Sequence, residues 1–138
     1  MPVPFSETVL KHALHFVMPR YVILRHETPP GYVRPTHWDL MLESGGVLRT
    51  WALADEPKVG AAIEAESLPD HRLDYLDFEG AVSGRGSVSR FDSGEHTLDD
   101  ECESRLVVRL DGARFQGTLQ LERRPDDSRR WLAQFPTE

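Results

Sequence analysis

The chain has little sulfur, few cations and no long apolar run, and each shortage excludes a class of protein. Its single cysteine, Cys102, has no second thiol to pair with, so no internal disulfide can form and a reducing cytoplasm is the expected compartment. Asp and Glu outnumber Lys and Arg by 23 to 16, a net charge of −7, which argues against coating nucleic acid through bulk positive charge. No run of about 18 apolar residues is present, so we expect no membrane span.

Motifs for several common chemistries are also missing. No serine or cysteine lies in a nucleophile motif, there is no P-loop, and "GRGS" lacks the strand and helix context of a dinucleotide site. Cys102 lies among acids in "DDECES", which should raise the pKa of its thiol and make it a poor nucleophile. His12, His15 and His96 lie in an N-terminal arm or an acidic loop, where we expect them to be solvated.

The residues that are present indicate one domain built from short elements. The chain of 138 residues is 39% hydrophobic and 28% charged, as in a globular domain with one core. Ten glycines and ten prolines interrupt it at short intervals. We expect residues 1–17 to form an N-terminal arm, disordered or holding a short helix from Ser6, and residues 18–138 to form the folded domain.

From Tyr21 onward, the apolar residues recur with the period of two that is typical of β-strands. Residues 37–53, "HWDLMLESGGVLRTWAL", predict a hairpin, and Asp111-Gly112 predicts another. The run "AAIEAE" suggests a helical turn within a connection, and "HRLDYLDFEG" suggests a strand. The whole pattern predicts an all-β fold, a compact closed or nearly closed β-barrel of about eight strands with short helical turns.

His37 and Asp39 are candidate ligands of a metal ion. They lie two apart on a predicted strand, so both project from one face and one metal ion can touch both. His26, across a proline-rich loop, is the candidate third ligand, and this ligand set suits Mn, Fe or Zn. In the alternative interpretation, His26 only ends a strand and the other two line a solvated face, because His-x-Asp is a common pattern.

His71 follows a Pro-Asp turn and opens a predicted strand. Alone it is most simply a surface histidine. As a fourth member of the cluster, it could be a general acid or contact a phosphate.

Several blocks of the chain occur in a fixed order between about Arg20 and Trp131. They are "YVILRHE", then "THWDLMLESGGVLRTWAL", then "LPDHRLDYLDFEGAVSGRGSVSRFDSGEH", followed by two late strands. Together they resemble the 3'-phosphoesterase domain family. Its best-known members form the N-terminal module of bacterial DNA ligase D, and others are short stand-alone proteins.

The resemblance implies a β-barrel that acts at a nucleic acid 3' end. The family removes a terminal ribonucleoside and then the 3'-phosphate, with manganese as the favoured metal. By this resemblance, His26, His37 and Asp39 are the metal ligands and His71 contacts the scissile phosphate, so His71, His37 and Asp39 are the expected catalytic residues. A nucleic acid 3' end is the expected partner, together with DNA-repair proteins. Positions that look structural are Trp51, Asp77, Glu79, Gly80 and Asp92.

The chain departs from the family pattern where a phosphate's charge is held. The arginine two residues after the metal aspartate is Met41 here, and a lysine after the Trp-Ala pair falls at Asp55. Candidate replacements that could bind the substrate phosphate are Arg25, Arg34, Arg49 and Lys58. Two functions therefore stay open. One is a metal-dependent phosphoesterase acting on a nucleic acid 3' end or a related phosphoester. The other is a non-catalytic, metal-stabilised barrel that binds a ligand or partner protein.

Overall fold

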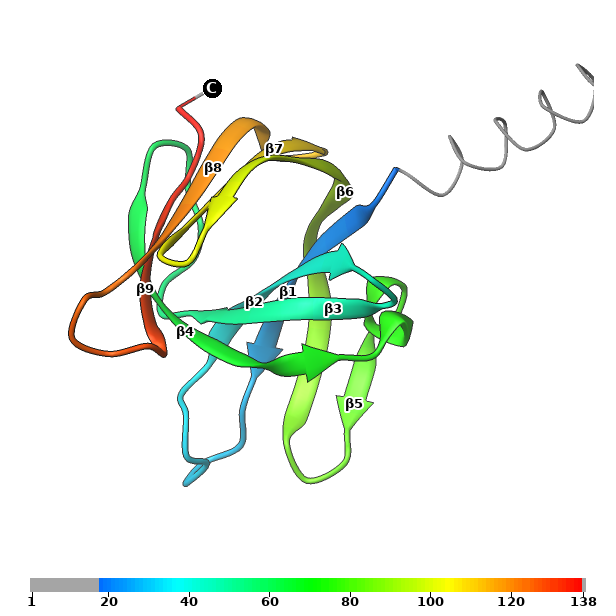
Figure 1. The fold of residues 1–138 in the computed structure, drawn as a ribbon. Helices are drawn as coiled ribbons and strands as arrows, with labels where there is room; N and C mark the ends of the chain where they lie inside the picture. Colours follow the sequence, from blue (N-terminus) through cyan, green and yellow to red (C-terminus); the bar gives the residue numbers. More distant parts are fainter. Residues whose placement is uncertain (1–17, 138) are drawn as a thin grey trace, which may run out of the picture.

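A computed structural model describes residues 18–137, which form one antiparallel sheet of nine strands (Figure 1). A single 3-10 turn, η1 (Leu73–Leu76), precedes β5 in this part of the chain. The arm predicted over residues 1–17 lies outside the described residues. The strands are β1 (Arg20–Glu27), β2 (His37–Ser44), β3 (Val47–Leu53), β4 (Ala62–His71), β5 (Gly80–Val82), β6 (Gly86–Cys102), β7 (Arg105–Gly112), β8 (Gln116–Arg123) and β9 (Arg130–Gln134).

The sheet closes into a barrel because β1 pairs with both β2 and β6. The closed ring runs β1-β2-β3-β4-β9-β8-β7-β6, and β5 adds to β6 outside it. Closure leaves those eight strands paired on both sides, which satisfies their backbone groups. The predicted all-β barrel of about eight strands is therefore confirmed. No helix among the described residues is long and apolar enough to cross a membrane.

Two apolar clusters, one on each side of the β1–β2 wall, stabilise this part of the barrel. Tyr21 and Ile23 of β1 point into the barrel core, and their neighbours Val22 and Leu24 point to the opposite face. On that outer face, Leu76 of η1 is among the residues that pack on them. The outer cluster consists of Val22, Leu24, Met41, Leu48, Leu76 and Val88, with Leu73, Tyr75 and Val82 packed against it. The strands that carry the candidate site are thus buried on both faces.

Two local predictions are wrong. All of the run "AAIEAE" except its first alanine lies in β4, where Ile63 and Ala65 face the core while Glu64 and Glu66 face outward. Alanine and glutamate are good helix formers, but pairing with β3 and β9 overrides that preference. The run "HRLDYLDFEG" contains η1 rather than a strand, because Leu73 and Leu76 must meet the same cluster at a spacing of three.

A buried polar bond joins the two strands that close the barrel. The hydroxyl of Tyr21 donates to Oδ2 of Asp92 at 2.5 Å, and the backbone N–H of Arg114 donates to Oδ1 at 2.8 Å. Gly112 lies against both side chains, and a Cβ there would collide with the Tyr21 hydroxyl. Nearer the surface, the Arg20 guanidinium pairs with Asp77 at 2.8 Å. These contacts give Asp92 and Asp77 structural roles.

Two predictions about titratable side chains are also wrong. His96 is only 7% exposed, donates from Nε2 to the carbonyl oxygen of Glu43 at 3.1 Å, and has its pKa lowered by burial. Cys102 is exposed, and hydrogen bonding to the backbone and side chain of Ser104 lowers the pKa of its thiol. The flanking acids do not dominate, because the turn into β7 brings Ser104 back to the sulfur.

Candidate functional site

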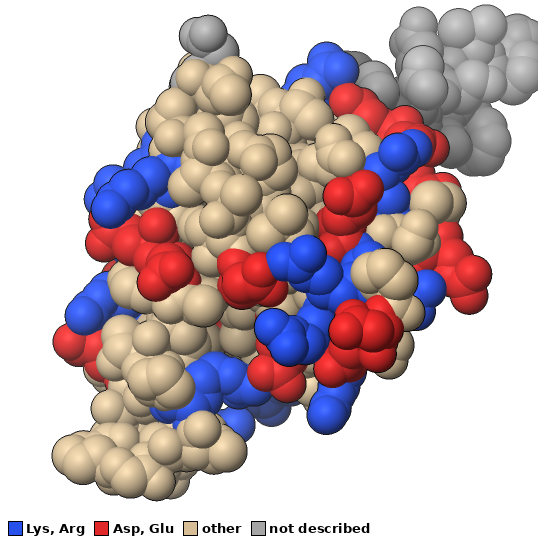
Figure 2. Space-filling model, turned by 90° about the vertical axis from the view of Figure 1, so that its left-hand side faces the viewer, with Lys and Arg blue, Asp and Glu red and all other residues tan. Residues whose placement is uncertain are grey.

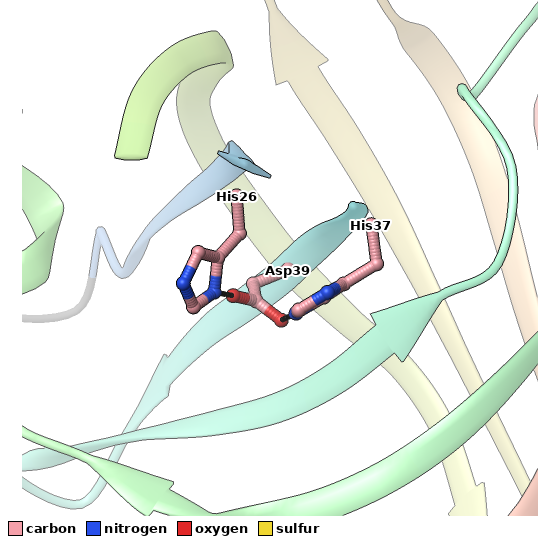
Figure 3. A group of neighbouring side chains, drawn as sticks. All are labelled: His26, His37 and Asp39. Atoms are coloured by element: carbon pink, nitrogen blue, oxygen red, sulfur yellow. Dashed lines mark hydrogen bonds and ion pairs between the residues drawn. The ribbon is translucent and has the colours of Figure 1, made fainter. Parts of the chain in front are cut away.

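Adjacent strand ends bring His26, His37 and Asp39 together (Figure 3). His26 near the end of β1 is the register partner of His37 at the start of β2, and Asp39 follows two residues along the same face. One side-chain atom from each lies within 4.8 Å of the others. Their side chains are 12%, 4% and 6% exposed, in chain order. The loop 28–36 therefore links two converging imidazoles, as the sequence suggested.

Backbone carbonyls fix which ring nitrogen of each histidine faces the cluster. Nε2 of His26 lies 2.7 Å from the carbonyl oxygen of Arg85, and Nδ1 of His37 lies 3.0 Å from that of Pro35. A carbonyl only accepts, so these nitrogens carry the protons. The other nitrogens, Nδ1 of His26 and Nε2 of His37, face the Asp39 carboxylate at 3.3 and 3.0 Å. In the neutral rings, both present lone pairs to an anion.

The Asp39 carboxylate sets the electrostatics of the cluster. Burial alone would raise the pKa of Asp39, but the hydrogen bonds that His26 and His37 donate in their protonated forms outweigh it, so the pKa is lowered. The same bond to Asp39 raises the pKa of His26 against the opposing effect of burial. The carboxylate thus stays ionised and draws positive charge to the point between the rings.

A cavity of about 380 Å³ opens beside the cluster, and His71 lies in its wall. Nδ1 of His71 lies 2.9 Å from the carbonyl oxygen of Pro69, which leaves Nε2 for another partner. The ring of Tyr75 meets His71 edge to face at 5.5 Å. The structure therefore gathers all four side chains named from the sequence around one space. The cavity is lined by His26, Tyr32, Arg34, His37, Asp39, Met41, Leu68, Pro69, Asp70, His71, Tyr75, Val82, Arg85 and Val88.

The cations at this cavity differ from most of those proposed from the sequence. Arg34 lines it and pairs with Glu66 at 2.6 Å, and Arg85 lines it as well. Three candidates for phosphate binding lie outside the lining, namely Arg25, Arg49 and Lys58.

Each of the three cations lies away from the cavity for a local reason, and for Arg25 that reason is the pleat of the strand. Arg25 precedes His26 on β1, so its side chain leaves from the opposite face, where it pairs with Glu27 and lies over the Trp38 ring. Arg49 lines a different cavity with His96 and pairs with Glu101 at 3.3 Å. Lys58 is exposed in the loop before β4, and Asp55 in the same loop does not line the cavity either.

Arg85 was not predicted as a site residue, because a backbone contact rather than a sequence motif places it beside the cluster. It precedes Gly86, whose φ of +94° few other residues adopt and whose Cα lies against the Glu27 carbonyl. A Cβ at Gly86 would collide with that carbonyl. Only glycine lets the β5–β6 turn approach β1 closely enough for the Arg85 carbonyl to hold His26. The glycine-rich "SGRGS" was the available clue.

Charge elsewhere is mixed rather than basic. On the side of the barrel that carries β9, basic and acidic side chains are interspersed (Figure 2). Glu64 there pairs with both Arg124 and Arg130. A nucleic acid held by this protein would therefore depend on a local site, as the net charge already indicated.

The protein is a closed antiparallel barrel with a His-His-Asp cluster on its outer wall. A cavity with a further histidine lies beside that cluster. Residues 26–123 match the family described as the DNA Ligase D 3'-phosphoesterase domain. The chain belongs to this family, which the blocks of sequence had suggested.

Curated relatives lie in much longer proteins. The Multifunctional non-homologous end joining DNA repair protein LigD of Mycobacterium tuberculosis is 37% identical over 126 residues, which is 82% of this chain and 15% of that protein. The corresponding LigD of Pseudomonas aeruginosa is 35% identical over 115 residues, which is 75% of this chain and 13% of that protein. The chain thus spans less than a fifth of the length of these relatives.

Proposed function

We propose that the protein is a metal-dependent phosphoesterase that acts at nucleic acid 3' ends, removing a 3'-terminal ribonucleoside or a 3'-phosphate. Family membership supports the reaction class. The convergence of two imidazole nitrogens and one carboxylate beside an open cavity supports the site, and it is the observation on which the proposal rests. The relatives are named as non-homologous end joining proteins, which supports a role in DNA repair with repair proteins as partners.

The donor set fits a divalent metal. Two neutral rings that aim lone pairs at a carboxylate are stable only with a positive charge between them, supplied by protons or by a cation. The carbonyls of Arg85 and Pro35 orient the rings as supporting acceptors orient metal-binding histidines. Three ligands leave positions open for water and substrate. Imidazole with carboxylate suits Mn, Zn or Fe, and we propose Mn because the family resemblance favours it.

Each residue at the cavity has a part in this chemistry. A bound divalent ion would supply Lewis acidity to a phosphoryl oxygen and activate a water. His26, His37 and Asp39 hold and orient that centre. His71, with Nε2 unused by other described residues, donates to the phosphate or protonates the leaving oxygen. The Arg85 guanidinium meets negative charge that develops on the phosphate.

The open cavity favours this function over a non-catalytic barrel. The loss of family cations at Met41 and Asp55 motivated the non-catalytic alternative, which predicts a blocked cleft or histidines that point apart. The histidine rings instead lie 4.8 Å apart, centre to centre, and the space beside them is open. Two arginines line that space, so cations are present although they come from other segments.

The test is hydrolysis of a primer-template that ends in one ribonucleotide, with and without Mn²⁺. We expect Mn-dependent release of the terminal nucleoside by the wild type, and loss of activity in His37→Ala and in chelator. His96→Gln is the matched control, because that histidine lies in another cavity. Equal activity in chelator and in His37→Ala would overturn the proposal.

A further inference from the structure

A second cavity adjoins the one at the metal cluster. It measures about 350 Å³, and three residues, Tyr75, Val82 and Arg85, line both spaces. The two cavities are therefore neighbours that share part of their walls. The second cavity lies outside the barrel, where η1 and β5 lie side by side (Figure 1). Its lining consists of Arg72, Asp74, Tyr75, Phe78, Ala81, Val82, Ser83 and Arg85.

A row of aromatic rings leads from the cluster into this second cavity. His71 meets Tyr75 at 5.5 Å, and Tyr75 meets Phe78 at 5.8 Å, with interplanar angles of 73° and 83°. Phe78 ends the row and is 37% exposed, one of the few large apolar side chains exposed among the described residues. A ring held by edge-to-face packing and open to solvent is a suitable platform for a flat ligand.

Charge in the second cavity favours an anionic ligand. Arg72 and Arg85 line it against one acid, Asp74. Neither arginine forms an ion pair with any side chain in residues 18–137. Arg85 stands at the junction of the two cavities, so its guanidinium can meet a phosphate at the cluster while the rest of the ligand extends toward Phe78.

We propose that the second cavity binds the nucleobase of the nucleotide whose 3' oxygen carries the scissile phosphate, and that this base stacks on Phe78. The inference rests on the proposed function and narrows its substrate to a nucleotide end rather than a small phosphoester. Single-strand nucleic acid sites combine aromatic platforms with cations in this way, and stacking tolerates every base. The base lies one sugar away from its phosphate, which matches two cavities that share a wall.

Binding of a fluorescent oligonucleotide with a 3'-phosphate tests the proposal without requiring turnover. The same oligonucleotide with an abasic terminal nucleotide is the control ligand, and both are titrated with protein in chelator, so that the proposed Mn-dependent hydrolysis does not consume them. We expect the wild type to bind the base-bearing end about 5- to 150-fold more tightly, the range of one base–aromatic stack. Phe78→Leu should abolish that preference, and Phe78→Tyr should retain it.

A purely structural role for Phe78 would change the affinity for both ligands equally, so the ratio separates the two roles. Lack of base preference in the wild type would overturn the proposal, whatever the stability of the variants. A preference that survives in Phe78→Leu would also overturn it. Base-dependent binding without hydrolysis would reject the proposed function alone, and hydrolysis without base preference would reject only this inference.

Discussion

The imidazole of His37 lies between two acceptor oxygens, one from the Asp39 carboxylate and one from the Pro35 carbonyl. Nε2 of His37 lies 3.0 Å from Oδ1 of Asp39, while Nδ1 of the same ring lies 3.0 Å from the carbonyl oxygen of Pro35. Oδ1 is buried and has no hydrogen-bond partner of acceptable geometry among the described residues. The close approach of two acceptors is costly unless positive charge lies between them. Either a proton on Nε2 or a bound cation can supply that charge, which makes the pair a candidate cation site.

Asp39→Asn should separate metal binding from folding. The amide nearly preserves the shape of the carboxylate but removes its charge, so we expect Mn²⁺ to stabilise the wild type and leave the variant unchanged. At a free metal concentration about 100 times Kd, the wild type should gain about 2.7 kcal/mol. Urea unfolding with Mn²⁺ and with chelator measures this gain in the wild type and in the variant. An equal gain in Asp39→Asn would show that the ion binds elsewhere.

Arg85→Ala should reduce phosphate hydrolysis while leaving His26 in place, because the backbone carbonyl that holds His26 remains. Loss of one preorganised donor to the developing charge costs about 10²-fold or more in rate. Arg25→Ala is the matched control, since that side chain lies on the opposite face of β1 over Trp38. Steady-state kinetics on the 3'-phosphate substrate measures both variants. Equal effects in the two would remove Arg85 from the site.

Gly86→Ala should damage the fold and the site together. Its positive φ and its contact with the Glu27 carbonyl leave no room for a Cβ, so we expect a loss of about 3 kcal/mol or more in unfolding free energy. Gly84→Ala is the comparison, because Gly84 also has positive φ but nothing lies within 4 Å. It should lose only about 1–2 kcal/mol. Denaturant unfolding that ranks the two variants equally would argue against close packing of the turn on β1.

His96 should make stability depend on pH. Burial lowers its pKa in the folded state, and its Nδ1 has no partner within residues 18–137, so protonation favours the unfolded chain. The stability that neutral His96 contributes is present above its ordinary pKa and is lost as pH falls toward the lower folded value. His96→Gln should flatten this part of the profile. Unfolding free energies measured between pH 7 and pH 4.5 check it, and an identical slope in the variant would contradict it.

Much of the fold and of the His-His-Asp cluster can be predicted from the sequence, because both depend on short-range patterns. Strand periodicity places His37 and Asp39 on one face, and the hairpin signals define the barrel strands. The same periodicity could have excluded Arg25, which is adjacent to His26 and therefore points away. It could not reveal β4, where alternation of Ile63 with Glu64 is hidden by good helix formers.

The part of the cavity that Arg85 lines, and the neighbouring Phe78, depend on tertiary contacts that no local pattern records. Arg85 reaches the cluster only because Gly86 lets one turn approach β1. Tyr75 lies between His71 and Phe78 only because η1 folds over the outer face of the barrel. The position where the family usually has an arginine holds Met41 here, and neither Arg85 nor Phe78 can be found from that pattern.

Calorimetric titration of the purified protein with Mn²⁺ tests the central claim most directly. The wild type should bind one ion per chain, and His26→Ala, His37→Ala and Asp39→Asn should each lose that binding. His71→Ala should retain one ion but lose hydrolysis of the 3'-phosphate, since that histidine faces the substrate rather than the ion. Binding that survives in all three ligand variants, or that is lost in His71→Ala, would contradict the account.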